Sequence, residues 1–164
     1  MKSLVTYATR HGNTRAIAEA IAAALAARGQ VLIADVNDVD HIDPEIDLIV
    51  VGGPTEGHGM TGPVIDFFDR VAPGALAGIA AAAFDTRLRW PKVLSGSAAV
   101  AITNRLRQAG ANLVREPESF LVTMKPELES GEVERAAAWA TALADEVGAV
   151  ITGSRHLAVA SGKG

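Results

Sequence analysis

The residues best suited to chemistry lie in one short polar turn, Thr9 to Thr14. This turn carries hydroxyls at Thr9 and Thr14, an amide at Asn13 and a single glycine, Gly12. It follows an apolar run, and a helical pattern begins directly after it. A turn of this kind points several backbone N–H groups to one spot at the positive end of the next helix, where a phosphate binds well. The sequence therefore predicts a phosphate site here.

Two kinds of nucleotide compete for that site. A dinucleotide site needs several glycines after the first strand, so that the backbone can approach a pyrophosphate. Only Gly12 is present, although Asp35 closes the next predicted strand, where a ribose-binding acid or an ordinary turn residue would stand. Hydroxyls in place of glycines suit one terminal phosphate, held by O–H and N–H donors together. The pattern therefore favours a mononucleotide.

Strands and helices alternate about five times along the chain. We expect strands at residues 2–8, 31–34, 48–51 and 76–84, and a fifth in two pieces at 112–115 and 119–123. We expect helices at residues 13–28, from Pro63, after a cap at Ser95, and along the stripe Val133, Ala137, Ala140, Leu143 and Val147. This alternation predicts an open, doubly wound, five-stranded parallel sheet in a three-layer α/β/α sandwich.

The ligand of such a sheet binds beyond the carboxyl ends of the strands, where the strand order reverses. The loops at those ends are residues 9–14, 53–62 and 85–94, and we expect them to converge on one site. The sheet and its helices would form one domain, residues 1–151. The remaining segment, residues 152–164, contains glycine and serine and is expected to be a flexible tail.

Composition narrows the class of protein. A length of 164 residues and a hydrophobic fraction of 49% argue for one folded domain. The net charge of −4 argues against a nucleic-acid partner, because nucleic-acid-binding proteins normally have a basic face. It has no cysteine, which excludes disulfides and thiolate chemistry and fits a cytoplasmic protein. The first strand begins too early to leave room for a signal peptide, and the longest apolar run, Ala75 to Phe84, is too short for membrane insertion. No cluster of side chains suggests a metal site.

Three motifs in this order resemble the flavodoxin family. The turn Thr9–Thr14 resembles its phosphate loop, and Val51–Thr55 resembles its third strand leading into the first flavin loop. The segment Phe84–Arg87 stands where the family has its second flavin loop. The resemblance covers most of residues 2–150. It implies non-covalent binding of FMN and electron transfer, and some members of the family reduce quinones.

The resemblance also implies which residues would contact FMN. The phosphate would be held by the side chains of Thr9, Asn13 and Thr14 and by the N–H groups of Arg10, His11 and Gly12. The first flavin loop would comprise Pro54, Thr55, Glu56, Gly57, His58 and Gly59, with Thr55 at the ribityl–phosphate end. The second would place the backbone of Asp85, Thr86 and Arg87 at the pyrimidine edge. Arg10 is a second cation for the phosphate or a solvated side chain, and Arg87 is a charge beside the flavin or a member of a surface salt bridge.

The sequence departs from the family at the residues that stack on the flavin. Glu56 stands where a tryptophan is usual, and the second loop has no tyrosine. Trp90 is placed either to reach the flavin or to cover a hydrophobic edge. An open flavin face would suit a small substrate, so three functions stay open. They are electron transfer with a redox partner protein or a small acceptor, reduction of a quinone or another small molecule, and a cofactor-free binding module.

The glycines of the first flavin loop suggest that one peptide group of the loop changes its orientation. Gly57 and Gly59 shape a turn in the simplest interpretation. We further hypothesise that the peptide joining Gly57 and His58 rotates, so that its carbonyl accepts a hydrogen bond from the reduced flavin. Glycine makes such a rotation inexpensive because it lacks a Cβ.

Overall fold

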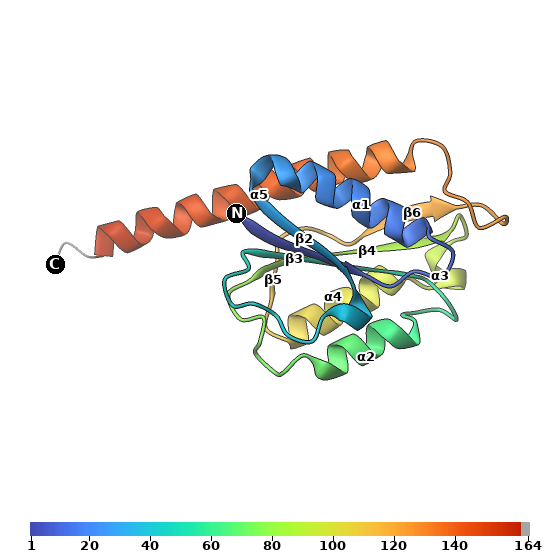
Figure 1. Ribbon diagram of the computed structural model, residues 1–164, viewed down its shortest axis with the longest axis horizontal. Coiled ribbons are helices and arrows are strands. Elements are labelled where there is room, and N and C mark those ends of the chain that lie inside the picture. Colours follow the sequence, from blue (N-terminus) through green and yellow to red (C-terminus); the bar gives the residue numbers. More distant parts are fainter. Residues whose placement is uncertain (162–164) are drawn as a thin grey trace.

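A parallel sheet lies between two layers of helices in the computed structural model, which describes the backbone of residues 1–161 and the side chains of residues 1–153 (Figure 1). In chain order the elements are β1 (Lys2–Tyr7), α1 (Asn13–Leu25), β2 (Gln30–Asp35), β3 (Leu48–Pro54), α2 (Gly62–Arg70), β4 (Ala80–Leu88), α3 (Lys92–Ser95), α4 (Ala98–Gln108), β5 (Asn112–Leu113), β6 (Glu118–Val122) and α5 (Glu132–Ser161). Short 3₁₀ turns follow α1 and β2.

The strand order is β2-β1-β3-β4-β5, with β6 continuing the fifth position alongside β4, and every pair is parallel. The predicted fold is therefore confirmed, including the interruption of the fifth strand around Pro117. Because β1 lies between β2 and β3, the chain leaves β1 and β3 toward opposite faces of the sheet. This is the switch point at which open α/β sheets bind ligands.

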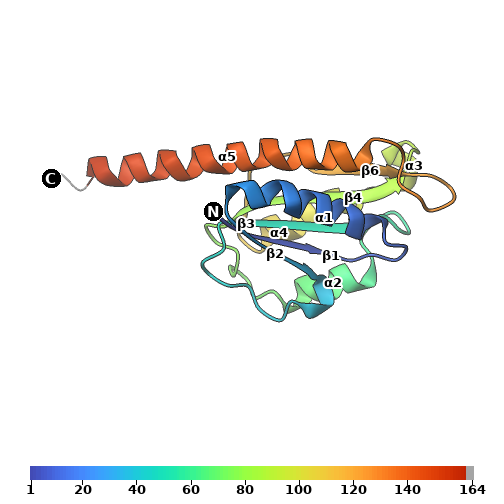
Figure 2. The ribbon, with the colours of Figure 1, turned by 45° about the horizontal axis from the view of Figure 1, so that its top comes forward.

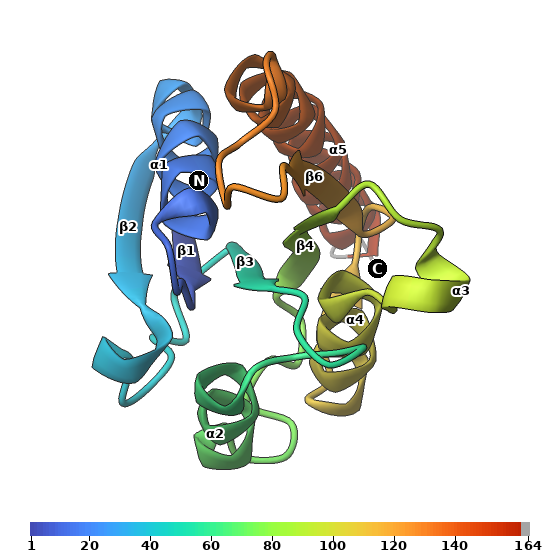
Figure 3. The same cartoon turned by 90° about the vertical axis from the view of Figure 1, so that its right-hand side faces the viewer.

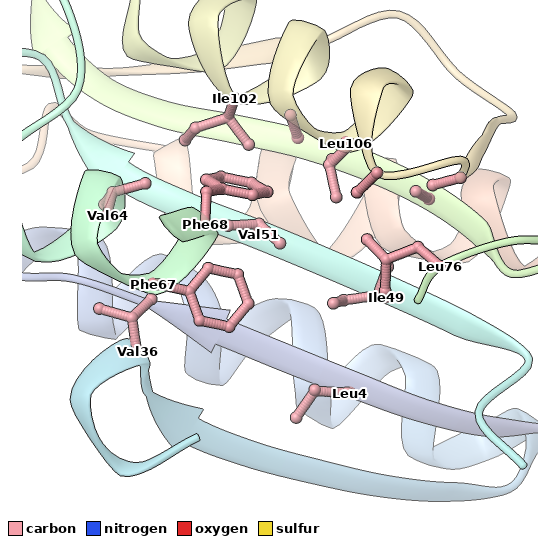
Figure 4. Close-up of a cluster of buried hydrophobic side chains, with 14 of the residues drawn as sticks. Leu4, Val36, Ile49, Val51, Val64, Phe67, Phe68, Leu76, Ile102 and Leu106 are labelled. Carbon is pink, nitrogen blue, oxygen red and sulfur yellow. The ribbon is translucent and has the colours of Figure 1, made fainter. Parts of the chain in front are cut away.

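Each face of the sheet is covered by two main helices. Helices α1 and α5 lie side by side on one face, and α2 and α4 cover the other (Figures 1 and 2). The first core joins Ile17 and Ile21 of α1 to Leu143 and Val147 of α5. The second core joins α2 and α4 to the sheet, and Figure 4 shows its labelled side chains: Leu4, Val36, Ile49, Val51, Val64, Phe67, Phe68, Leu76, Ile102 and Leu106. Burial on both faces explains the continuous apolar sequence of β3.

Strand β4 differs from its prediction at both ends. It was expected at residues 76–84 but runs from Ala80 to Leu88. Leu76 is buried in a turn before the strand, where its N–H donates to the carbonyl of Ala109. The last residues of β4, Asp85 to Leu88, pair with β6, and Asp85 and Thr86 also pair with the end of β3. Residues 85–88 of the expected loop 85–94 are therefore strand, because two neighbouring strands supply their backbone partners.

The last helix also departs from its prediction. Val133 was expected on the inner face but is 43% exposed, whereas Trp139 is buried and packs edge-on against Phe120. The helix does not end near residue 151, since its backbone stays helical through Ser161 and extends past the sheet (Figure 2). The helix continues through Gly148 and Gly153, although each glycine costs about 1 kcal/mol relative to alanine. The expected tail thus begins as helix, and residues 162–164 lie outside the described residues; the domain boundary at 151 stays a prediction.

Candidate functional site

Four chain segments meet at the carboxyl end of the sheet, the end that faces the viewer in Figure 3. They enclose a cavity of about 120 Å³. Its lining residues come from the turn after β1, the end of β3 and the loop after it, the end of β4, and the end of β6 and the loop after it: Thr9, Arg10, His11, Asn13, Thr14, Pro54, Thr55, Glu56, Thr86, Arg87, Leu88, Val122 and Pro126. Most of the residues singled out in the sequence are therefore brought together. Val122 and Pro126 were missed, because nothing in their types marks them as lining a site.

The turn after β1 presents the free end of a helix to this cavity. Gly12 is the N-cap of α1, and no side chain caps the helix. The first backbone bond of the helix runs from the N–H of Ala16 to the carbonyl of Gly12, at 3.0 Å. The hydroxyl of Thr9 accepts the N–H of Gly12, also at 3.0 Å, which closes the turn. The N–H groups of the first helical turn thus remain available for an anion.

Two side chains expected on a phosphate line the cavity and also bond to other parts of the protein. The hydroxyl of Thr14 is buried and hydrogen-bonds the hydroxyl of Thr86 at 2.8 Å, which ties α1 to β4. The amide of Asn13 donates to the carbonyl of Pro126 at 2.7 Å and fixes the loop after β6 over the turn. Asp35, weighed as a ribose ligand, accepts hydrogen bonds from the backbone and side chain of Asn37 and serves as a turn residue.

Arg10 and Glu56 form an ion pair across the site. One guanidinium nitrogen of Arg10 lies 3.2 Å from both carboxylate oxygens of Glu56. The Arg10 side chain is 67% exposed, so the pair contributes little to stability, about 0–1 kcal/mol. Both residues also line an adjoining cavity of about 200 Å³ on the α2 side. Arg10 is therefore a largely solvent-exposed side chain that pairs with the first flavin loop.

The first flavin loop makes a tight two-residue turn at Gly57 and His58. The backbone of Glu56 and Gly59 exchanges two hydrogen bonds, at 3.1 and 3.0 Å. Gly57 and His58 both have positive φ, 51° and 73°. Positive φ at both central residues is the signature of a type I′ turn, and it is unusual for a side chain such as His58. The turn is held against the segment before α4 by a bridge between His58 and Gly96.

The carboxylate of Asp85 does not line the cavity. It is fully buried, and its Oδ2 accepts hydrogen bonds from the hydroxyls of Thr55 and Ser97 and from the N–H of Ala99, at 2.9, 2.7 and 2.9 Å. The Thr55 hydroxyl in turn accepts the N–H of Ala98 at 2.8 Å. These groups cap α4, whose N-cap is Ser97 rather than the expected Ser95. Asp85 thus anchors the first flavin loop to α4.

Arg87 and Trp90 shape the end of the second segment. The Arg87 guanidinium donates to the carbonyls of Leu88 and Trp90, at 3.1 and 2.7 Å, and forms no ion pair with a carboxylate of the described residues. The salt-bridge alternative for Arg87 is therefore wrong. Trp90 is 53% exposed and does not cover a core edge. It lines a third cavity, of about 230 Å³, together with Thr55, Gly57, His58, Arg87, Leu88, Leu94 and Ser95.

The fold and the site together define an open parallel α/β domain of the class that binds a nucleotide at the switch point of its sheet. Residues 4–88, more than half of the chain, match the flavodoxin domain. The chain therefore belongs to the flavodoxin family. No curated protein sequence matches it significantly.

Solved flavodoxins share the architecture along nearly their whole length. Flavodoxin 2 from Bacillus cereus is 28% identical, with a TM-score of 0.74 over 89% of this chain and 99% of the other. Flavodoxin 1 from the same organism is 25% identical, with a TM-score of 0.73 over 90% and 97%. A flavodoxin from the domain Archaea shares the fold at 24% identity, with a TM-score of 0.69 over 90% and 99%. Within residues 1–161, no helix is both long and apolar enough to cross a membrane.

Proposed function

We propose that this protein binds FMN and transfers electrons to or from a redox partner protein or a small-molecule acceptor. The observation that carries this proposal is the uncapped start of α1, which opens into the cavity where the chain segments after β1, β3 and β4 meet. An anionic ligand is the natural occupant of such a helix end. Two solved flavodoxins at 25% identity or more support the same function.

The residues present fit FMN in two adjoining cavities. The N–H groups of the first turn of α1 and the hydroxyl of Thr9 would hold the phosphate. The neighbouring cavity of about 230 Å³, with Gly57, His58 and Trp90, would take the ring system. Arg87, which lines both cavities and lacks a carboxylate partner among the described residues, would favour negative charge on the ring and raise its potential. FMN supplies the redox chemistry, and the protein supplies binding, orientation and charge.

The test compares FMN with riboflavin, which carries the same ring without the phosphate. Unfolding measured at increasing FMN should show a rising midpoint, because a ligand at 100 times its Kd stabilises by about 2.7 kcal/mol. Riboflavin should stabilise much less. In Thr9→Val the loss of one hydrogen bond to a charged group, about 1.5–3 kcal/mol, should weaken FMN binding at least tenfold and leave riboflavin unaffected.

Two control variants separate this effect from general damage. Thr9→Ser keeps the hydroxyl and should restore FMN binding. Thr141→Val removes an exposed hydroxyl that bonds only within α5, to the carbonyl of Ala137, and should change nothing. Equal unfolding midpoints with and without FMN would instead favour the cofactor-free binding module.

Reduction of quinones or other small molecules is a second candidate. Two observations favour it: position 56 holds Glu56 and not an aromatic residue that could cover the ring, and Trp90 is half-exposed. Such a cavity would admit a small planar substrate beside the ring. Steady-state reduction of a quinone by NAD(P)H, without an added protein, distinguishes this activity from partner-dependent electron transfer. A cytoplasmic location is also proposed, on the absence of cysteine.

A further inference from the structure

The segment around α3 exposes large apolar side chains at the same end of the molecule as the candidate site. Trp90 is 53% exposed, Val93 94% and Leu94 64%; we call these three residues the α3 patch. Figure 3 shows α3 standing out from the carboxyl end of the sheet, beside α4. Single exposed apolar residues are ordinary, but three within five positions on one protruding turn mark a contact surface.

The charge around the α3 patch differs in sign from that of the whole chain. The chain carries a net charge of −4. Lys92 is exposed and lies between Trp90 and Val93 in the chain, and Arg87, which lines the same cavity as Trp90 and Leu94, donates only to carbonyl groups. Neither cation pairs with a carboxylate of the described residues, whereas nearby Arg89 is paired with Glu129 at 2.5 Å. The patch is therefore a locally positive, apolar surface on an acidic molecule.

The α3 patch is continuous with the candidate site. Trp90 and Leu94 line the cavity of about 230 Å³ that also contains Gly57 and His58. A protein bound on the patch would therefore lie directly beside the group held in that cavity. Electron transfer needs this proximity, and a small contact is sufficient, because weak redox encounters commonly bury less than about 1,200 Å² in total.

We propose that the α3 patch is the docking surface for the redox partner, and that the partner is a protein whose contact face is apolar and bordered by aspartate and glutamate. This inference rests on the proposed electron-transfer function. A membrane is disfavoured, because binding to anionic lipid uses clusters of about 4–8 basic residues, whereas two uncompensated cations, Lys92 and Arg87, border the patch. Opposite charges across the contact would chiefly raise the rate of encounter.

The first test measures electron transfer to the FMN-loaded protein from a reduced, acidic plant-type [2Fe–2S] ferredoxin. Each encounter moves one electron, so the cluster is oxidised and the bound FMN is reduced by one electron. The second-order rate constant should fall as salt rises, because the attraction is screened. Val93→Asp should lower it about tenfold or more, and Lys92→Glu should reverse its salt dependence. Val150→Asp, at an exposed position of α5, should leave it unchanged.

The second test measures binding without FMN, so that it remains informative if the proposed function fails. The protein has two tryptophans, Trp90 in the patch and Trp139 at 5% exposure, and their indole N–H signals can be followed by NMR. Oxidised ferredoxin should shift or broaden the signal of Trp90 and leave that of Trp139 unchanged. If the protein does not bind FMN but ferredoxin still shifts the Trp90 signal, the cofactor proposal is refuted and the docking surface is supported.

Several outcomes would overturn the docking proposal. The acidic ferredoxin would fail to bind, or a basic cytochrome c would bind as tightly as the ferredoxin. Alternatively, Val93→Asp and Val150→Asp would change the rate constant of electron transfer equally. Binding to vesicles of anionic phospholipid that is lost in Val93→Asp would assign the patch to a membrane instead. Because Val93 is 94% exposed, its substitution should not unfold the protein, and urea unfolding of the variant checks this.

Discussion

Asp85 shows how one buried side chain connects several elements near the site. Its carboxylate joins the loop after β3, through Thr55, to the start of α4, through Ser97 and Ala99. Sequence reasoning placed Asp85 at the flavin by its backbone. It did not anticipate that the side chain turns away from the cavity, because that direction depends on which face of β4 meets α4.

Removing this carboxylate should destabilise the fold. In Asp85→Ala the buried N–H of Ala99 and the half-buried hydroxyls of Thr55 and Ser97 lose their acceptor, and because an unsatisfied buried group costs about 1–3 kcal/mol, we expect a total loss of about 3 kcal/mol in the free energy of unfolding. Ser97→Ala is the graded comparison, because it removes one cap and should cost about 1 kcal/mol. Urea unfolding measures both. Equal stability of Asp85→Ala and wild type would show that the carboxylate is not the anchor.

The turn at Gly57 and His58 allows a prediction about its motion. Rotation of the peptide between them would convert the type I′ turn to type II′, which relieves the positive φ of His58 and still requires glycine at position 57. Gly57→Ala should therefore oppose the rotation. If the rotation accompanies reduction, the gap between the two one-electron potentials of bound FMN should change by roughly 40–130 mV, equivalent to the about 1–3 kcal/mol cost of placing alanine in the backbone region, nearly exclusive to glycine, that the rotated turn requires.

Gly59→Ala is the matched control for this turn. Gly59 has an ordinary φ, and a Cβ added there meets no atom within 4 Å. The two one-electron potentials of FMN bound to Gly59→Ala should therefore equal those measured with wild type in a spectroelectrochemical titration. The rotation hypothesis fails if Gly57→Ala and Gly59→Ala give the same gap as wild type while both bind FMN.

Among the elements, α5 is attached to the sheet by an ionic network at its first turn. Glu132 is 8% exposed and accepts from the N–H of Leu121 at 2.6 Å and from Arg135 at 2.7 and 3.0 Å. Arg135 also lies over the ring of Phe120, 4.5 Å from its centre. Burial opposes ionisation of Glu132, but the hydrogen bonds from Arg135 and Leu121 outweigh it and hold the pKa of its carboxyl below the usual value.

This lowered pKa predicts a dependence of stability on pH. A carboxyl whose pKa is lower in the folded state stabilises the fold above its unfolded pKa, about 4.3 for glutamate, and loses this contribution as the pH falls through the folded value. Urea unfolding from about pH 6 to 3 should therefore show a steeper loss for wild type than for Glu132→Gln. Glu134→Gln, on an exposed neighbour, should follow wild type. Parallel curves for all three proteins would contradict the network.

Strand and helix boundaries show where local pattern was insufficient. Helix α1 was predicted almost residue by residue, because the stripe of Ile17, Ile21 and Leu25 and the stop at Gly29 are local signals. Strand β4 was displaced by four residues at each end, because alanine has no strong preference and the pairing with β3 and β6 sets its length. The stripe of α5 was misassigned at Val133, because the position of Phe120 decides which side of that helix meets the sheet.

For the whole molecule, the arrangement of the sheet brings distant residues to one end. The strand order places the segments after β1, β3 and β4 side by side, and the α3 patch borders them (Figure 3). The electrostatic contrast between an acidic chain and a positive patch likewise arises only from the folded arrangement, since composition records the net charge alone. Function at this scale depends on which surfaces lie next to one another, and binding of a partner at the α3 patch tests this arrangement.

The sequence by itself determined the alternation of elements, the five-stranded parallel sheet and the stretches that approach its carboxyl end. These follow from hydrophobic periodicity and turn residues, which act over a few neighbouring positions. Only the tertiary structure decided the partners of the polar side chains. Thr14 meets Thr86, Arg10 meets Glu56 and Thr55 meets Asp85 across 72, 46 and 30 residues of chain. No local pattern encodes such pairs, because each depends on how separate strands and helices come together in the packed fold.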